Sequence, residues 1–166
     1  MRFADRPTTE TEIFVAVPPG HVWPLVTEIM TPARFGTELQ AATWADPGLG
    51  PGLGARFTGR NYHPARGEWE TTSTIVDFVP ERRFGWAVGD PEFPSAVWRL
   101  ELAPEGDGTR LRYWAQLGPG PSGTTAVIEQ MPDKEERIIA RRLQEWEKNM
   151  TATITGIKEL AEGAAR

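Results

Sequence analysis

The chain contains no cysteine, and only two of its 166 residues are histidine, His21 and His63. The lack of cysteine excludes disulfides, thiolate chemistry and the common cysteine zinc sites. The two histidines lie far apart in the sequence, and neither has a second ligand four residues later. We therefore expect no metal site, and we expect each histidine to lie on the surface or to make a structural hydrogen bond.

Long apolar runs and an excess of positive charge are also missing. No run of about 18 apolar residues exists, so we expect no membrane span. The 18 lysines and arginines are outnumbered by 23 aspartates and glutamates, and the net charge of −5 argues against a nucleic-acid-binding surface. The N-terminal segment Met1–Pro7 lacks the apolar stretch of a secretory signal, so we expect a cytoplasmic protein.

Tryptophan, by contrast, is abundant, with seven residues. Each aromatic side chain buries roughly 150–250 Å², so seven of them shape a core or a pocket. A chain of this length suits one domain with a sizeable core. We expect residues 1–166 to form a single domain whose core spans about residues 11–161.

Apolar and polar residues alternate along much of the chain, which is typical of half-buried strands. This alternation predicts seven strands, at residues 11–17, 39–44, 56–62, 68–79, 83–88, 96–102 and 111–117. Between the first two, Val22, Val26 and Ile29 recur at helical spacing and predict a short helix. A second short helix is expected over Ala33–Glu38.

The C-terminal part is strongly helical from Asp133 onward. Its apolar residues repeat at steps of three and four, namely Ile139, Leu143, Trp146, Met150, Ile154, Ile157 and Leu160. Such a helix spans about 40 Å at about 1.5 Å per residue, long enough to cross a sheet. Gly156 is expected to weaken it by roughly 1 kcal/mol relative to alanine.

This order of elements predicts an α+β helix-grip fold, in which a curved antiparallel sheet wraps around the long C-terminal helix. The helix is the largest apolar surface that can cover the sheet. A curved sheet closed on one helix leaves space between them, which is a common setting for a ligand site.

Five segments carry a resemblance to a known family: Ala16–Trp23, Phe35–Trp44, Pro51–Asn61, Pro80–Trp86 and Gly108–Leu111. In order and spacing they resemble the START-like superfamily. They are closest in pattern to its bacterial polyketide cyclase/dehydrase and lipid-transport (SRPBCC) group, which is related to birch-pollen allergens. The resemblance implies the helix-grip fold and a cavity for a small apolar or aromatic molecule. It leaves the chemistry open, because the superfamily contains cyclases, carriers, co-chaperone-like domains and enzymes.

The glycine-rich segment Gly50–Ala55 has a spacing similar to a dinucleotide fingerprint. That fingerprint needs a preceding strand and a following helix, whereas here a strand follows and Pro51 lacks an amide N–H. We interpret the segment as a turn and expect no cofactor. The chain also has no Gly-x-Ser-x-Gly turn.

Two polar residues share the inward phase of apolar neighbours and are candidate catalytic residues. Asn61 ends a strand in phase with Phe57, and Tyr113 is in phase with Leu111 and Ala115. A polar group isolated in an apolar cavity has a shifted pKa and makes strong hydrogen bonds. Either residue alternatively makes only a core hydrogen bond.

The candidate ligand-binding residues are mainly inward aromatic side chains, with two arginines near the start of the helix. They are Trp44, Phe57, Asn61, Trp69, Trp86, Trp98, Tyr113, Arg137, Arg141 and Trp146. For the aromatic residues the alternative is ordinary core packing, and for the arginines it is a solvated helix face.

Three interpretations of function remain open at this point. In the first, the chain is a polyketide cyclase or aromatase-like protein of secondary metabolism, in which Asn61 and Tyr113 stabilise an enolate or assist proton transfer. In the second, it carries or senses a lipid or hydrophobic metabolite without chemistry. In the third, it is a co-chaperone-like interaction domain. For the first two we expect a small hydrophobic molecule as partner, and a monomer or a homodimer.

Overall fold

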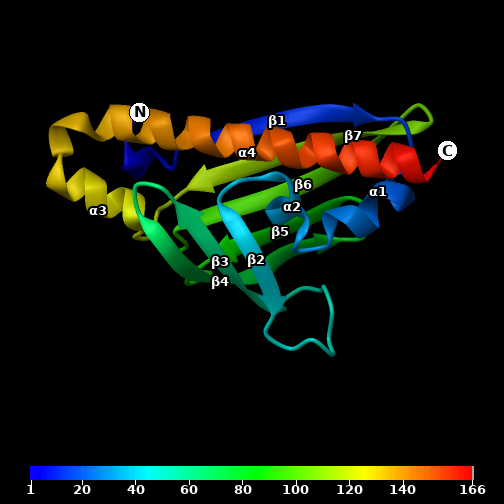
Figure 1. Cartoon of the computed structure of the whole chain (residues 1–166), viewed down its shortest axis with the longest axis horizontal. Coiled ribbons are helices and arrows are strands. Elements are labelled where there is room, and N and C mark those ends of the chain that lie inside the picture. The colour runs from blue at the N-terminus through cyan, green and yellow to red at the C-terminus, as the bar shows by residue number, and fades with distance from the viewer. Residues whose placement is uncertain (166) are drawn as a thin grey trace.

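The computed structural model describes residues 1–165. It confirms the α+β helix-grip fold: seven antiparallel strands form one curved sheet in the order β1-β7-β6-β5-β4-β3-β2, and a long helix lies across it (Figure 1). The strands are β1 Thr8–Val15, β2 Leu39–Trp44, β3 Arg56–His63, β4 Gly67–Val79, β5 Arg83–Val88, β6 Ala96–Glu105 and β7 Gly108–Leu117.

Four α-helices and two 3-10 turns complete the described chain. The helices are α1 Pro19–Val26, α2 Thr31–Phe35, α3 Gly123–Gln130 and α4 Glu135–Ala164, and the 3-10 turns are η1 Phe3–Asp5 and η2 Pro132–Lys134. None of the helices between residues 1 and 165 combines the length and apolar character that a membrane span needs.

Some boundaries differ from those expected. The first strand begins at Thr8, because its first residues pair with the end of β7. Helix α2 ends at Phe35, since Gly36 adopts an extended backbone and leads the chain into β2. Asp133 lies in η2, so α4 begins two residues later, at Glu135.

The strand register places the apolar side chains on the face toward α4. In the β6–β7 hairpin, Trp98 pairs with Ala115 and Leu100 pairs with Tyr113. Because alternate residues of a strand point to the same face, this register brings the buried side chains of both strands together. The predicted inward phase of these two strands is confirmed.

Helix α4 packs unevenly on the sheet. Among the described residues it makes close backbone contacts with β1 and fewer with β7, and it stands away from β2, β3, β4 and β5 (Figure 1). On the β1 side, Thr151 Oγ1 donates to Thr11 Oγ1 at 3.3 Å and Lys158 Nζ donates to the Phe14 carbonyl at 2.8 Å. The helix and the sheet therefore diverge toward the β2 edge.

Gly156 has a role that the helical pattern did not predict. A Cβ atom at this position would overlap the ring of Phe35, which packs on α4 from helix α2. The glycine thus permits the close approach of α2 to α4, in addition to its cost in helix propensity.

We predict that Gly156→Ala destabilises the protein by about 1–2 kcal/mol, because the overpacking against Phe35 exceeds the propensity gain of about 1 kcal/mol. Urea unfolding followed by circular dichroism measures the change. Gly163→Ala is the matched control, since a Cβ there meets no atom within 4 Å. A more stable G156A protein would contradict this packing role.

Candidate functional site

A pocket of about 870 Å³ lies where α4 and the sheet diverge. Its walls come from the inner face of β2 to β7, from α1 to α3, and from α4 as far as Ile157. Eight of the candidate ligand-binding residues line it: Phe57, Asn61, Trp69, Trp86, Trp98, Tyr113, Arg141 and Trp146.

Two candidates lie elsewhere. Trp44 packs edge-on against Phe57, with 5.7 Å between ring centroids, so it supports a residue of the pocket wall without lining the pocket itself. Arg137 is exposed and does not line the pocket. It lies two residues before the buried Ile139, and two residues rotate the side chain by about 200° around a helix.

The aromatic residues form one continuous wall from the sheet to α4. Trp86 and Trp98 are stacked, with 6.5 Å between centroids and 16° between planes. Trp98 also lies 4.5 Å from Trp146 on α4 and 5.8 Å from Tyr113 on β7. Faces and edges of such rings suit a flat aromatic partner, because aromatic pairs prefer offset-stacked or edge-to-face contacts.

Tyr113 places a hydroxyl within this wall. The residue is only 3% exposed, and its hydroxyl makes no hydrogen bond with any residue of the described chain. Burial raises the pKa of the phenol well above its usual value of about 10. The hydroxyl therefore stays protonated and can act as a hydrogen-bond donor.

Asn61 lies on β3 and is 8% exposed. Its Nδ2 donates to Thr71 Oγ1 at 3.3 Å and makes longer contacts of 3.5 Å with the carbonyls of Gly59 and Trp69. Its carbonyl oxygen accepts no hydrogen bond within the described residues. The side chain thus retains hydrogen-bonding capacity inside the pocket.

The pocket reaches the surface near the N-terminal part of α4. Val127 of α3, Met131 directly after α3 and the 80% exposed side chain of Arg141 line it there. Arg66 also lines this opening, with its guanidinium carbon 4.0 Å from the centre of the Trp69 ring. Burial, followed by the charge of Arg142, lowers the pKa of Arg66.

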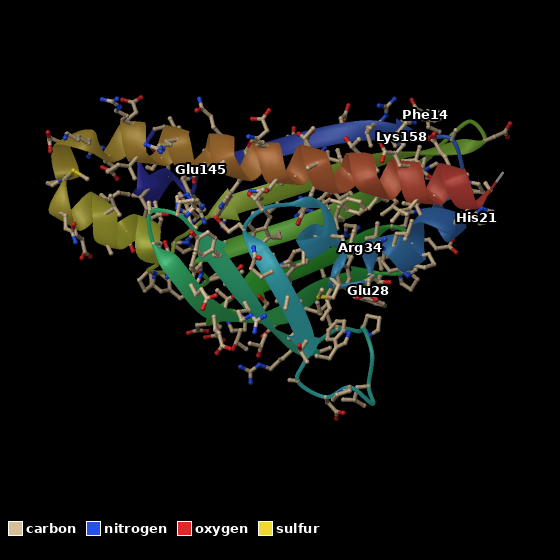
Figure 2. The ribbon with its side chains drawn as sticks, viewed as in Figure 1. Phe14, His21, Glu28, Arg34, Glu145 and Lys158 are labelled. Carbon is tan, nitrogen blue, oxygen red and sulfur yellow. The ribbon has the colours of Figure 1, made fainter. Side chains whose placement is uncertain are left out.

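A set of polar bonds crosses from α4 to the diverging edge of the sheet. We call Glu38, His63, Arg142, Glu145 and Asn149 the polar clamp. Arg142 makes two hydrogen bonds to the Glu38 carboxylate, of 2.6 and 2.9 Å, and Asn149 Oδ1 accepts from the Thr37 amide at 2.7 Å. Glu145 lies 3.2 Å from His63 Nε2, and Figure 2 shows it where α4 passes the β3–β4 hairpin.

His63 has both ring nitrogens engaged. The amide of Ala65 donates to Nδ1 at 3.0 Å, so the proton of the neutral ring lies on Nε2 and points to Glu145. This is the structural hydrogen bond expected for a histidine, and it leaves no free nitrogen to take a proton from a ligand. No group of His, Asp and Glu within residues 1–165 could hold a metal ion.

Sequence reasoning overlooked Arg142 and Glu145. The helical spacing could have identified Arg142 as a residue that faces the sheet. It follows the buried Ile139 by three residues and precedes the buried Trp146 by four. Residues three and four apart share a helix face. Arg142 therefore points toward the sheet, whereas Arg137 does not.

The contacts of Glu145 in the polar clamp predict that the stability of the fold depends on pH. Burial alone would raise the pKa of this carboxyl, but hydrogen bonds from Arg142 and His63 and their charges lower it overall. A carboxyl with a lowered pKa stabilises the fold above its unfolded pKa of about 4.3. That stabilisation is lost as the pH falls below this value.

We expect Glu145→Gln to reduce the free energy of unfolding by about 1 kcal/mol near neutral pH, and the difference from wild type to shrink as the pH falls below about 4.3. Urea unfolding across this pH range measures both effects. Glu147→Gln, on the exposed face of the same helix, is the control. A difference that stays constant with pH would exclude the ionic role of Glu145.

Comparisons with known proteins agree with this geometry. The family model described as polyketide cyclase/dehydrase and lipid transport matches residues 6–157. The solution structure of a polyketide-cyclase-like protein from Corynebacterium glutamicum is 31% identical, with a TM-score of 0.66 over 96% of this chain and 93% of that one. No sequence among curated proteins matches the chain.

Two aromatase/cyclases share the fold at low identity. The di-domain protein StfQ of the steffimycin biosynthetic pathway is 16% identical, with a TM-score of 0.71 over 95% of this chain and 52% of that one. The Zhui aromatase/cyclase of Streptomyces sp. R1128 is 15% identical, with a TM-score of 0.65 over 96% of both chains. The match to the family model and the Corynebacterium relative confirm the resemblance seen in the sequence: this chain belongs to the polyketide cyclase/dehydrase and lipid-transport family.

Proposed function

We propose that the chain binds a small aromatic molecule in the pocket between α4 and the sheet, as a polyketide cyclase or aromatase-like protein. The observation that carries this proposal is the hydroxyl of Tyr113. It is a donor without a protein partner, on a side chain that is only 3% exposed, in a pocket whose lining includes several aromatic rings. Buried polar groups in proteins are normally hydrogen-bonded, so a ligand oxygen is the natural partner.

The pocket supplies two elements of a cyclisation. Its walls hold a flexible chain in a folded shape, which brings the reacting carbon atoms together. The Tyr113 hydroxyl then donates a hydrogen bond to the oxygen that gains negative charge as the carbon–carbon bond forms, while the free carbonyl oxygen of Asn61 accepts one from a hydroxyl or enol of the same chain. The raised pKa of Tyr113 fits a donor, because the phenol does not ionise near neutral pH.

The second candidate is a carrier of a hydrophobic molecule without chemistry. The predominance of aromatic and aliphatic side chains in the pocket favours it. The hydrogen bonds at both ring nitrogens of His63 also favour a carrier, because this histidine cannot serve as a general base without breaking one of them. The family description, which includes lipid transport, is compatible with either function.

Binding is testable through tryptophan fluorescence. We predict that aromatic ligands such as 2-naphthol change the intrinsic fluorescence saturably, and that Trp98→Phe removes much of this change. Trp114→Phe is the control, because Trp114 lies on the outer face of the sheet beneath Arg99. No saturable response across a diverse set of aromatic and fatty ligands would contradict the binding function.

Catalysis is testable at Tyr113 and Asn61. With a linear poly-β-keto thioester as substrate, we expect Tyr113→Phe and Asn61→Ala to abolish product formation, while affinity falls by no more than about tenfold, the effect of one hydrogen bond. The chain has two tyrosines, so Tyr62→Phe, at an exposed position, is the matched control. Equal losses of affinity and turnover would instead indicate that these residues only bind the ligand, and no product with the wild-type protein would indicate the carrier.

A further inference from the structure

The wall of the pocket formed by β3 and β4 carries a row of small polar side chains, of which the proposed function uses only Asn61. We call Asn61, Thr71 and Ser73 the polar strip. Ser73 is the most buried of the three, at 2% exposure, yet its hydroxyl makes no hydrogen bond within the described chain. All three residues line the pocket.

The strand geometry sets the spacing of the two hydroxyls. Thr71 and Ser73 are alternate residues of β4, so they point to the same face, and their Cα atoms are about 6.7 Å apart along the strand. In the register, Thr71 pairs with Gly59 and Ser73 pairs with Phe57 on β3. The two hydroxyls thus form a row beside an aromatic ring.

Gly59 keeps this row accessible. A Cβ atom there would lie 3.0 Å from Thr71 Oγ1 and 3.2 Å from Leu39 Cδ1, so a side chain at this position would crowd the threonine hydroxyl. With glycine, the space beside Thr71 belongs to the pocket.

Both hydroxyls have a free donor. Thr71 Oγ1 accepts a hydrogen bond from Asn61 Nδ2 at 3.3 Å, and its own O–H donates to no described residue. Ser73 can both donate and accept. Two unused hydroxyl donors on one wall match two acceptor oxygens on one edge of a ligand.

We propose that Thr71 and Ser73 determine ligand specificity by binding two oxygen atoms on the same edge of a fused aromatic ring system. This inference rests on the proposed binding function and adds the chemical class of the ligand. A hydrocarbon or a fatty acyl chain leaves both hydroxyls without partners, whereas a ring system with two oxygens about 7 Å apart on one edge meets the strand spacing.

The test compares two isomers of equal size and polarity by isothermal titration calorimetry. In 2,7-dihydroxynaphthalene the oxygens leave the same edge, and in 2,6-dihydroxynaphthalene they leave opposite edges. We expect wild-type protein to bind the 2,7 isomer about five- to tenfold more tightly, the effect of one additional net hydrogen bond. Thr71→Val and Ser73→Ala should each reduce this preference to about twofold or less.

Thr72→Val is the matched control, because Thr72 lies between the two residues and is exposed on the outer face of β4. It should keep the full preference for the 2,7 isomer. Equal binding of the isomers by wild-type protein would overturn the role of the polar strip and leave aromatic binding standing. Binding of neither isomer would overturn both this inference and the proposed function.

Discussion

The uneven seating of α4 on the sheet is the constraint on which the rest of the structure depends. At the β1 edge the helix packs closely, and Lys158 donates to the carbonyl of Phe14 at 2.8 Å. At the β2 edge it is connected by long polar side chains, above all Arg142, Glu145 and Asn149. Close backbone packing on one side and bridging polar side chains on the other separate the helix from the sheet toward the β2 edge, and the pocket occupies the resulting space.

The pocket has three regions of different chemistry. Indole rings in contact with one another form the wall near α4, as in Trp98 and Trp146. Small hydroxyls on β4 form a second wall, with Ser73 the most buried. Charged groups surround the opening, where Arg66 and Arg141 face solvent. A flat molecule with oxygens on one edge can contact the first two regions at once, which a saturated lipid cannot do with equal complementarity.

Much of the fold could be predicted because each element has its own period. Alternation placed β2 and β5 at their observed ends, and the three- and four-residue repeat found α4. The alternation of apolar and polar residues also predicted that the side chains of Tyr113 and Asn61 point inward, and both residues are buried. The alternation of a strand and the repeat of a helix are carried by that element's own residues. Both can therefore be recognised without knowing which elements pack beside it.

The remainder depends on contacts between elements that are distant in sequence. The function of Gly156 depends on Phe35, more than one hundred residues earlier, and is invisible in the helical pattern alone. Ser73 could be assigned an inward phase, but its lack of a partner follows from what β3 and β5 place beside it. Arg137 and Arg142 both lie near the start of α4, but the rotation of about 100° per residue turns Arg142 toward the sheet and Arg137 toward solvent.

The resonances of the tryptophan indoles offer the most direct measurement of the central claim, that a ligand occupies the space between α4 and the sheet. Nuclear magnetic resonance can follow the indole N–H of each of the seven tryptophans while 2,7-dihydroxynaphthalene is added. The account predicts that ring currents from the ligand shift the four indoles that line the pocket, those of Trp69, Trp86, Trp98 and Trp146. The indoles of Trp23 and Trp114, which do not line it, should stay in place. Shifts confined to Trp23 and Trp114, or no shifts at all, would contradict the account.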